Sequence, residues 1–181
     1  MRKICSIGVI LLLISATFAG VIFAKKVDLS TAKRIGIVQL KAYSQIRLTQ
    51  GLSHPGYSIQ TIRPLEDTRT GRILAYILDL KPTGFIAIST DTNIRPVIAY
   101  SYHSNFSMQD VEDNVLLHML KRDMRYRLEA ISIISETIKS INNQLWEEYL
   151  SEEKSQTLIG ELASADQWPE DDTGWLDTTW V

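Results

Sequence analysis

The strongest constraint on this chain is a stretch from Ser107 to Ile159 that contains no glycine and no proline. Apolar residues recur through it every three or four positions, which is the period of an amphipathic α-helix. Because a straight helix of that length is long for so small a domain, we expect one long or broken C-terminal helix. Helix propensity is lowest at Ser132–Ser135 and Ser140–Asn143, so a break is expected at one of them. The apolar stripe comprises Leu117, Leu120, Met124, Leu128, Ile131, Ile134, Ile138, Ile141, Leu145 and Tyr149.

The middle of the chain predicts a β-sheet. Two apolar segments, Arg72–Leu80 and Phe85–Ser89, flank Lys81–Gly84, whose proline and glycine are typical of a turn. Pro96–Tyr102 follows after a short polar loop, and a further short β segment is expected at Tyr57–Ile62, ahead of a turn-rich stretch. Such short connections favour an antiparallel sheet of three or more strands.

An amphipathic pattern from Thr31 to Gln50 predicts an N-terminal helix, with capping residues at Asp28–Ser30. The expected fold class is therefore α+β, an antiparallel sheet packed by this helix and by the C-terminal helix. We interpret the C-terminal stripe as core packing against the sheet, with a surface for a partner as the alternative. The predicted core includes Tyr76, Leu78, Phe85, Ile88, Val97, Leu120, Met124 and Leu128.

Residues 1–24 have the order of a secretory signal peptide: two basic residues, an uncharged apolar run, then small residues. Thr17–Ala19 and Ile22–Ala24 both fit a cleavage site. The apolar run is also about long enough, at roughly 20 residues, for an uncleaved membrane anchor. We favour export, which predicts a secreted or periplasmic protein with no membrane contact beyond this segment.

Export would remove Cys5, the only cysteine, so the remainder would have neither a disulfide nor a thiol nucleophile. Residues 25–181 keep 17 of the 19 Lys and Arg and all 21 Asp and Glu, for a net charge of −4, which gives no electrostatic basis for binding nucleic acid. No catalytic, phosphate-binding or metal-ligand motif is present, and His54, His103 and His118 have no motif partner. We expect no catalytic residue, no metal and no cofactor.

The chain becomes polar after Tyr149. Residues 161–181 carry six acidic residues and no Lys or Arg, so we interpret 151–173 as an exposed acidic linker. The last residues, 174–181, change character again, with two tryptophans among small polar residues. They predict the start of another domain.

Two segments, Gly84–Asp91 and Arg95–Ser101, followed by Phe106, resemble the signature of the streptopain pro-region, a module also known as a Spi-type protease inhibitor domain. Ala75–Leu80 fits the strand that precedes that signature. The resemblance covers roughly residues 28–150.

The C-terminus resembles the same family independently. Trp175–Val181 is similar to the beginning of the mature streptopain-type catalytic domain. The glutamine, cysteine and histidine of the family's active site would lie beyond this point, so no catalytic residue is carried over. This resemblance implies a precursor truncated before its cysteine endopeptidase domain.

The resemblance implies that residues 25–150 form an inhibitory pro-domain. It would keep a streptopain-type cysteine protease domain inactive, in cis or in trans, and assist its folding until the linker is cut. A stand-alone secreted inhibitor is one alternative, and an exported structural or adhesion module without a protease partner is another. Because loops on a rigid sheet usually carry recognition, the expected protease contacts are Thr90, Asp91, Asn93, Arg95, His103 and Asn105.

Overall fold

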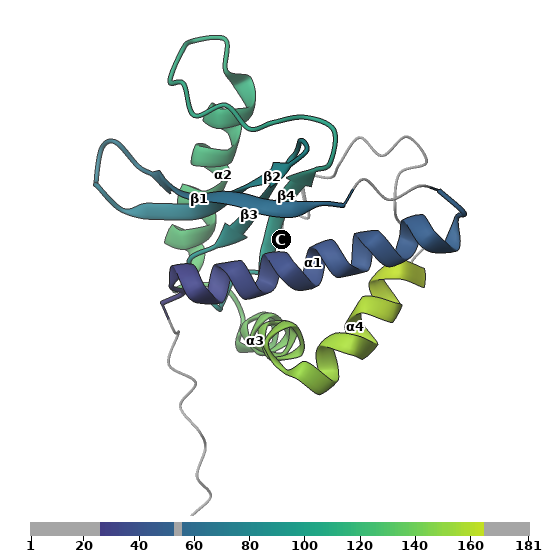
Figure 1. The fold of residues 1–181 in the computed structure, drawn as a ribbon. Helices are drawn as coiled ribbons and strands as arrows, with labels where there is room; N and C mark the ends of the chain where they lie inside the picture. Colours follow the sequence, from purple (N-terminus) through teal and green to yellow (C-terminus); the bar gives the residue numbers. More distant parts are fainter. Residues whose placement is uncertain (1–25, 53–55, 165–181) are drawn as a thin grey trace, which may run out of the picture.

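The computed structural model describes residues 26–52 and 56–164, which form a four-stranded antiparallel sheet with helices on both faces (Figure 1). The predicted α+β class and antiparallel sheet are confirmed. In chain order the elements are α1 (Leu29–Thr49), β1 (Ser58–Glu66), β2 (Ile73–Lys81), β3 (Phe85–Ser89), β4 (Val97–Ser101), α2 (Val115–Ala130), α3 (Glu136–Leu150) and α4 (Glu152–Ser164).

The sheet has the order β1-β2-β3-β4, and every neighbouring pair is antiparallel. Strand β1 continues to Glu66, four residues past the predicted end. It includes Pro64, which lies opposite Tyr76 of β2. Proline has no N–H to donate, and it is tolerated here because β1 lies at the edge of the sheet.

Alternate residues of β2 enter two separate cores. Tyr76 and Leu78 face the core that α1, α3 and α4 cover, whereas Ala75 and Ile77 face the core under α2. A sheet that is covered on both faces needs apolar residues at nearly every position, as in the run from Leu74 to Leu78. Of the eight predicted core residues, seven are buried, and Val97 is partly buried against the α1 core.

The prediction of one long or broken C-terminal helix was only partly right, because three helices follow the sheet. The first begins at Val115, where the Asn114 side chain accepts a hydrogen bond from the Leu117 N–H. The break after Ala130 matches the first predicted site, and Ser135 caps α3. The second predicted site, Ser140–Asn143, lies within α3 and does not break it.

The apolar stripe is buried through α2 but only in part through α3. Leu117, Leu120, Met124 and Leu128 are buried, whereas Ile141 is 60% exposed. Helix α3 buries Tyr149 of the stripe together with Asn142 and Trp146, which are not part of it. The turn after α2 reorients the chain, so the buried side of α3 includes only part of the stripe.

Residues 152–164 were predicted to belong to an exposed linker, but in the structure they form α4. Helix α4 packs along α1 and buries Ser155, Leu158 and Ile159 (Figure 1). Arg34 of α1 ties the α3–α4 corner by donating a 2.6 Å hydrogen bond to the Leu150 carbonyl. The predicted segments 1–24 and 174–181 lie outside the described residues, as does the rest of the predicted linker, 165–173.

Helix α1 approaches the sheet closely at Gly36. A Cβ at this position would overlap the side chain of Leu78 in β2 and crowd that of Ile59 in β1. Packing therefore favours glycine here, although a helix interior otherwise disfavours it by about 1 kcal/mol relative to alanine.

Candidate functional site

Within residues 26–52 and 56–164, no group of three or more His, Cys, Asp and Glu side chains is placed to hold a metal ion. His103 and His118 are exposed, and His54 lies outside the described residues. No helix in the same ranges is both long and apolar enough to cross a membrane. The candidate surface is formed by the loops at the two ends of the sheet and by α2.

The two loops predicted to contact a protease lie at opposite ends of the sheet. Phe85 at the start of β3 pairs with Ser101 at the end of β4, and Ile88 near the end of β3 pairs with Val97. The loop between β3 and β4 therefore lies at one end, and the segment after Ser101 lies at the other. The structure does not bring the six predicted contact residues into one site.

The loop between β3 and β4 is fixed by hydrogen bonds to the start of β2, to Val27 before α1 and to α3. The Thr90 hydroxyl donates to the Ile73 and Leu74 carbonyls, and the Thr90 carbonyl accepts from Val27. Asn93 is also buried, and its carbonyl accepts a 2.6 Å hydrogen bond from Asn142 of α3. Thr90 and Asn93 therefore stabilise the fold and are not available for contact. Asp91 is half-buried, and Arg95 is exposed.

At the opposite end, Asn105 organises the turn between β2 and β3. Its side-chain oxygen accepts hydrogen bonds from the Thr83 hydroxyl and the Gly84 N–H. Three residues before Asn105, the buried ring of Tyr102 stacks on the ring of Tyr43, with ring centroids 3.6 Å apart. These contacts fix the backbone on both sides of His103, whose side chain is exposed.

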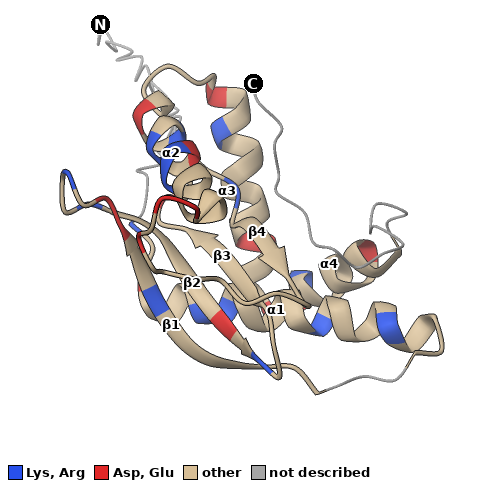
Figure 2. Cartoon of the chain, turned by 90° about the horizontal axis from the view of Figure 1, so that it is seen from above, with Lys and Arg blue, Asp and Glu red and all other residues tan. Residues whose placement is uncertain are grey.

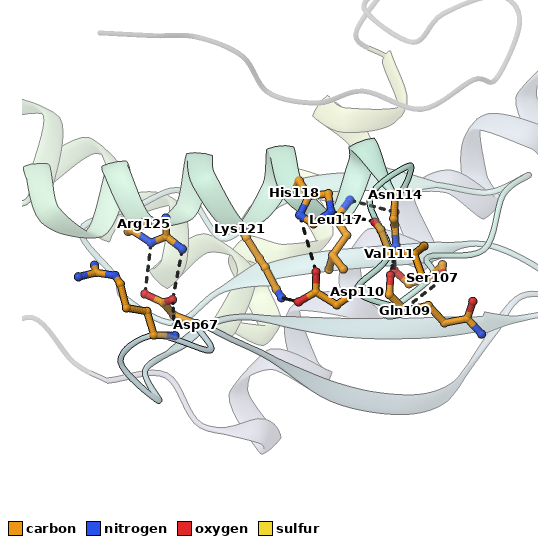
Figure 3. Close-up of polar contacts among 11 residues, drawn as sticks. Asp67, Ser107, Gln109, Asp110, Val111, Asn114, Leu117, His118, Lys121 and Arg125 are labelled. Carbon is orange, nitrogen blue, oxygen red and sulfur yellow. Dashed lines mark hydrogen bonds and ion pairs between the residues drawn. The ribbon is translucent and has the colours of Figure 1, made fainter.

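The segment after Asn105 leads to α2 and is fastened to it by polar contacts (Figure 3). Asn114 donates to the Ser107 and Gln109 carbonyls while it caps the helix. The His118 ring nitrogen Nε2 lies 2.9 Å from the Val111 carbonyl oxygen. The segment 107–114 therefore extends the surface of α2 rather than forming the first turns of that helix.

Asp110 and Lys121 complete this attachment with an ion pair of 2.8 Å between Lys121 Nζ and Asp110 Oδ2 (Figure 3). The hydrogen bond from Lys121 lowers the pKa of Asp110, with smaller charge effects from Lys121 and His118. Asp110 is therefore ionised at neutral pH and holds the segment to α2.

A second ion pair ties α2 to the turn between β1 and β2. Arg125 donates to both carboxylate oxygens of Asp67, each at 3.2 Å (Figure 3). The backbone N–H of Arg69 lowers the pKa of Asp67 most, burial opposes this, and Arg125 and Thr70 lower it further. The carboxylate of Asp67 thus links the turn to the helix.

The outer face of α2 carries large apolar side chains that sequence reasoning missed. Val115 is 62% exposed, Met119 51% and Tyr126 54%. Their spacing of four and seven residues places them along one side of the helix. The sequence contains this pattern, because the three exposed apolar residues recur at helical spacing on a different side of the helix from the buried stripe. Exposed apolar residues aligned in this way are typical of helices that dock on a partner.

The exposed apolar side of α2 is the candidate binding surface of this domain. Residues 24–126 match the Spi protease inhibitor family, the type found as the streptopain propeptide. Since the match covers more than half of the chain, the chain belongs to this family, and membership implies a cysteine protease as its binding partner. No curated protein and no solved structure matches the chain.

The family match covers α1, the whole sheet and α2 as far as Tyr126. Helices α3 and α4 lie beyond it, although Trp146, Tyr149, Leu158 and Ile159 belong to the core that covers one face of the sheet. The two C-terminal helices are therefore part of this domain's fold but not of the matched region.

Proposed function

We propose that this chain is the inhibitory pro-region of an exported streptopain-type cysteine peptidase, which it holds inactive and helps to fold. The observation that carries the proposal is the family match over residues 24–126. Residues 1–24 supply the export signal, 165–173 supply the linker that is cut, and 174–181 begin the peptidase domain. The domain that inhibits is then residues 26–164, fourteen residues longer at its C-terminal end than the sequence analysis predicted.

The inhibitory surface that we propose is the exposed side of α2 with the segment that leads to it. Val115 and Met119 are aligned along this side, and Val111 lies in the segment fastened to the helix by Asn114 and His118. The inner face of the helix is committed to the core through Leu120 and Met124. Because the outer apolar side chains lie on a helix that is already rigid, docking them costs little conformational entropy.

His103 and Asn105 lie on the same chain segment, between the sheet and α2, and remain candidates for the edge of this surface. Arg95 lies at the other end of the sheet, so we propose no role for it in the same contact. An inhibitor tethered to its protease needs only moderate intrinsic affinity, because a short linker gives an effective concentration in the millimolar range.

The surface can be tested by measuring binding of the full chain to an inactivated streptopain-type peptidase by calorimetry. Met119→Asp is expected to weaken binding by at least about tenfold, as expected for a charge placed in a buried apolar contact. Ile133→Asp is the matched control, because Ile133 is 84% exposed but lies beyond the matched residues and off the α2 stripe. Equal effects of the two substitutions would contradict this choice of surface.

Two other functions would give different results. A stand-alone inhibitor would bind through the same surface, but the coding sequence would end at Val181 rather than continue into a peptidase domain. A structural or adhesion module would not bind the peptidase at all. Reading the coding sequence past Val181 therefore separates the first two, and the calorimetric experiment separates both from the third.

A further inference from the structure

Helix α1 carries charge of one sign. Its 21 residues include Lys33, Arg34, Lys41 and Arg47 and no acidic residue, as the blue positions along it in Figure 2 indicate. Arg34 is engaged with the Leu150 carbonyl. Lys33 and Lys41 are exposed, and Ile37 lies exposed between them on the same side of the helix.

A groove runs between this side of α1 and the edge strand β1. It has a volume of about 330 Å³, with apolar walls from α1 and β1 and the two lysines at its rim. A smaller groove of about 150 Å³ lies on the other side of α1, toward the start of α4, and shares Ile37 and Lys41 with the first. The larger groove is lined by Lys33, Ile37, Leu40, Lys41, Ser44, Tyr57, Ser58 and Ile59.

We infer that residues 165–173 of this chain dock in the larger groove. They carry Asp166, Glu170, Asp171 and Asp172 and no basic residue, which complements the positive rim. Trp168 supplies one large apolar side chain for the apolar walls. Lysine rims and apolar walls together favour this combination over a purely charged or purely apolar ligand.

The position of α4 makes the groove accessible to this segment. Helix α4 packs along α1, and its last turn lies beside the C-terminal half of α1 (Figure 1). Nine extended residues span about 30 Å, whereas Lys33 and Thr49 are separated by about 24 Å along the helix axis. The segment that follows Ser164 is therefore long enough to run along α1 as far as both lysines.

Docking would hold the segment after α4 against the domain instead of leaving it free in solution. Its accessibility to a protease would then depend on the charge of the groove. The inference concerns only this chain's own residues, so it stands or fails independently of the proposed inhibition of a peptidase.

The environment of Trp168 tests the inference in the full chain. Trp175→Phe and Trp180→Phe leave Trp168 and the buried Trp146 as the only tryptophans. Acrylamide quenching of their fluorescence is then compared in this background and with Lys33→Glu/Lys41→Glu added. Arg69→Glu/Arg72→Glu, in the exposed turn between β1 and β2, is the matched control for the same change in charge.

We expect the groove variant to raise the quenching constant of Trp168 by about threefold, since two attractive contacts become repulsive. The turn variant should leave it unchanged, and about 0.5 M NaCl should reproduce the groove variant by screening. Equal quenching in the groove variant and its parent would overturn the inference. Protection of Trp168 that rises with protein concentration would also overturn it, because the occupant would then belong to a second copy.

Discussion

Gly84 offers a sharp test of how the sheet is built. It precedes β3, has a φ of +107°, and donates its N–H to the Asn105 side chain. A Cβ placed on it would overlap the Ser101 carbonyl oxygen and lie 3.0 Å from the Tyr102 Cα. Both neighbours are backbone atoms, so no rotation of a side chain relieves the overlap.

The cost of Gly84→Ala can be worked from these two effects. A positive φ disfavours an L-residue by about 1–2 kcal/mol, and forcing an extra carbon into a packed site costs about 1–3 kcal/mol. We therefore expect the free energy of unfolding to fall by about 2–5 kcal/mol. The measurement is urea denaturation of the full chain, followed by circular dichroism.

Gly71→Ala is the matched control. Gly71 has a φ of +69°, but a Cβ there would meet no atom within 4 Å. Only the conformational cost of about 1–2 kcal/mol applies, and the reduced entropy of the unfolded chain is the same in both variants. If the two substitutions destabilise the protein equally, the close approach of Gly84 to β4 is refuted.

Ending the chain at Ser151 removes α4 with its buried Leu158 and Ile159. This truncation should lower the free energy of unfolding by about 3–6 kcal/mol. An unchanged urea midpoint would contradict the packing of α4. The pKa of Asp67 is lowered in the folded state, so the contribution of its carboxylate to stability is complete above the ordinary pKa of 3.8 and is lost as the pH falls below that value. Asp67→Asn should therefore flatten the acid limb of a plot of melting temperature against pH. An unaltered limb would count against the role of this carboxylate. Burial raises the pKa of Tyr149 above its ordinary value of 10.0, so the stability that depends on its neutral form is present below pH 10 and is lost at higher pH. Tyr149→Phe should also lower the free energy of unfolding at pH 7 by about 1–3 kcal/mol. The reason is that the buried Gln39 side chain loses its 2.8 Å hydrogen bond from the Tyr149 hydroxyl.

The elements with strong periodicity could be predicted from the sequence. Helix α1 begins two residues before its predicted start, and β3 matches its predicted bounds. The turn chemistry of Lys81–Gly84 correctly placed the hairpin between β2 and β3. These features depend on local sequence, and local pattern was sufficient to find them.

The errors came from contacts between distant segments. Residues 152–164 looked like a linker because they are polar overall, but three residues on one side of α4 are buried against a helix more than 100 positions earlier. The stretch after Ile62 was predicted to be turn-rich, but it continues β1 as far as Glu66, and Pro64 is tolerated there because β1 is an edge strand. Single-sequence patterns do not report which surface a weakly amphipathic segment will meet.

The candidate site was predicted least well for the same reason. Thr90 and Asn93 are polar residues of a predicted loop, but both are buried in the structure. The Thr90 hydroxyl donates to the Leu74 carbonyl, and the Asn93 carbonyl accepts a hydrogen bond from Asn142 of α3. The exposed side of α2 was overlooked because the apolar stripe on its inner side dominated the pattern. Which of two apolar stripes is buried depends on the crossing of α2 over the sheet, which the sequence alone does not define.

The central claim is that this domain inhibits a streptopain-type cysteine peptidase, and titration of such a peptidase with the full chain tests it most directly. We predict that hydrolysis of a peptide substrate falls as the chain is added and is abolished at saturation, with an inhibition constant below about 1 µM. Met119→Asp should raise that constant by at least about tenfold. Full peptidase activity in the presence of about 10 µM folded chain would contradict the claim.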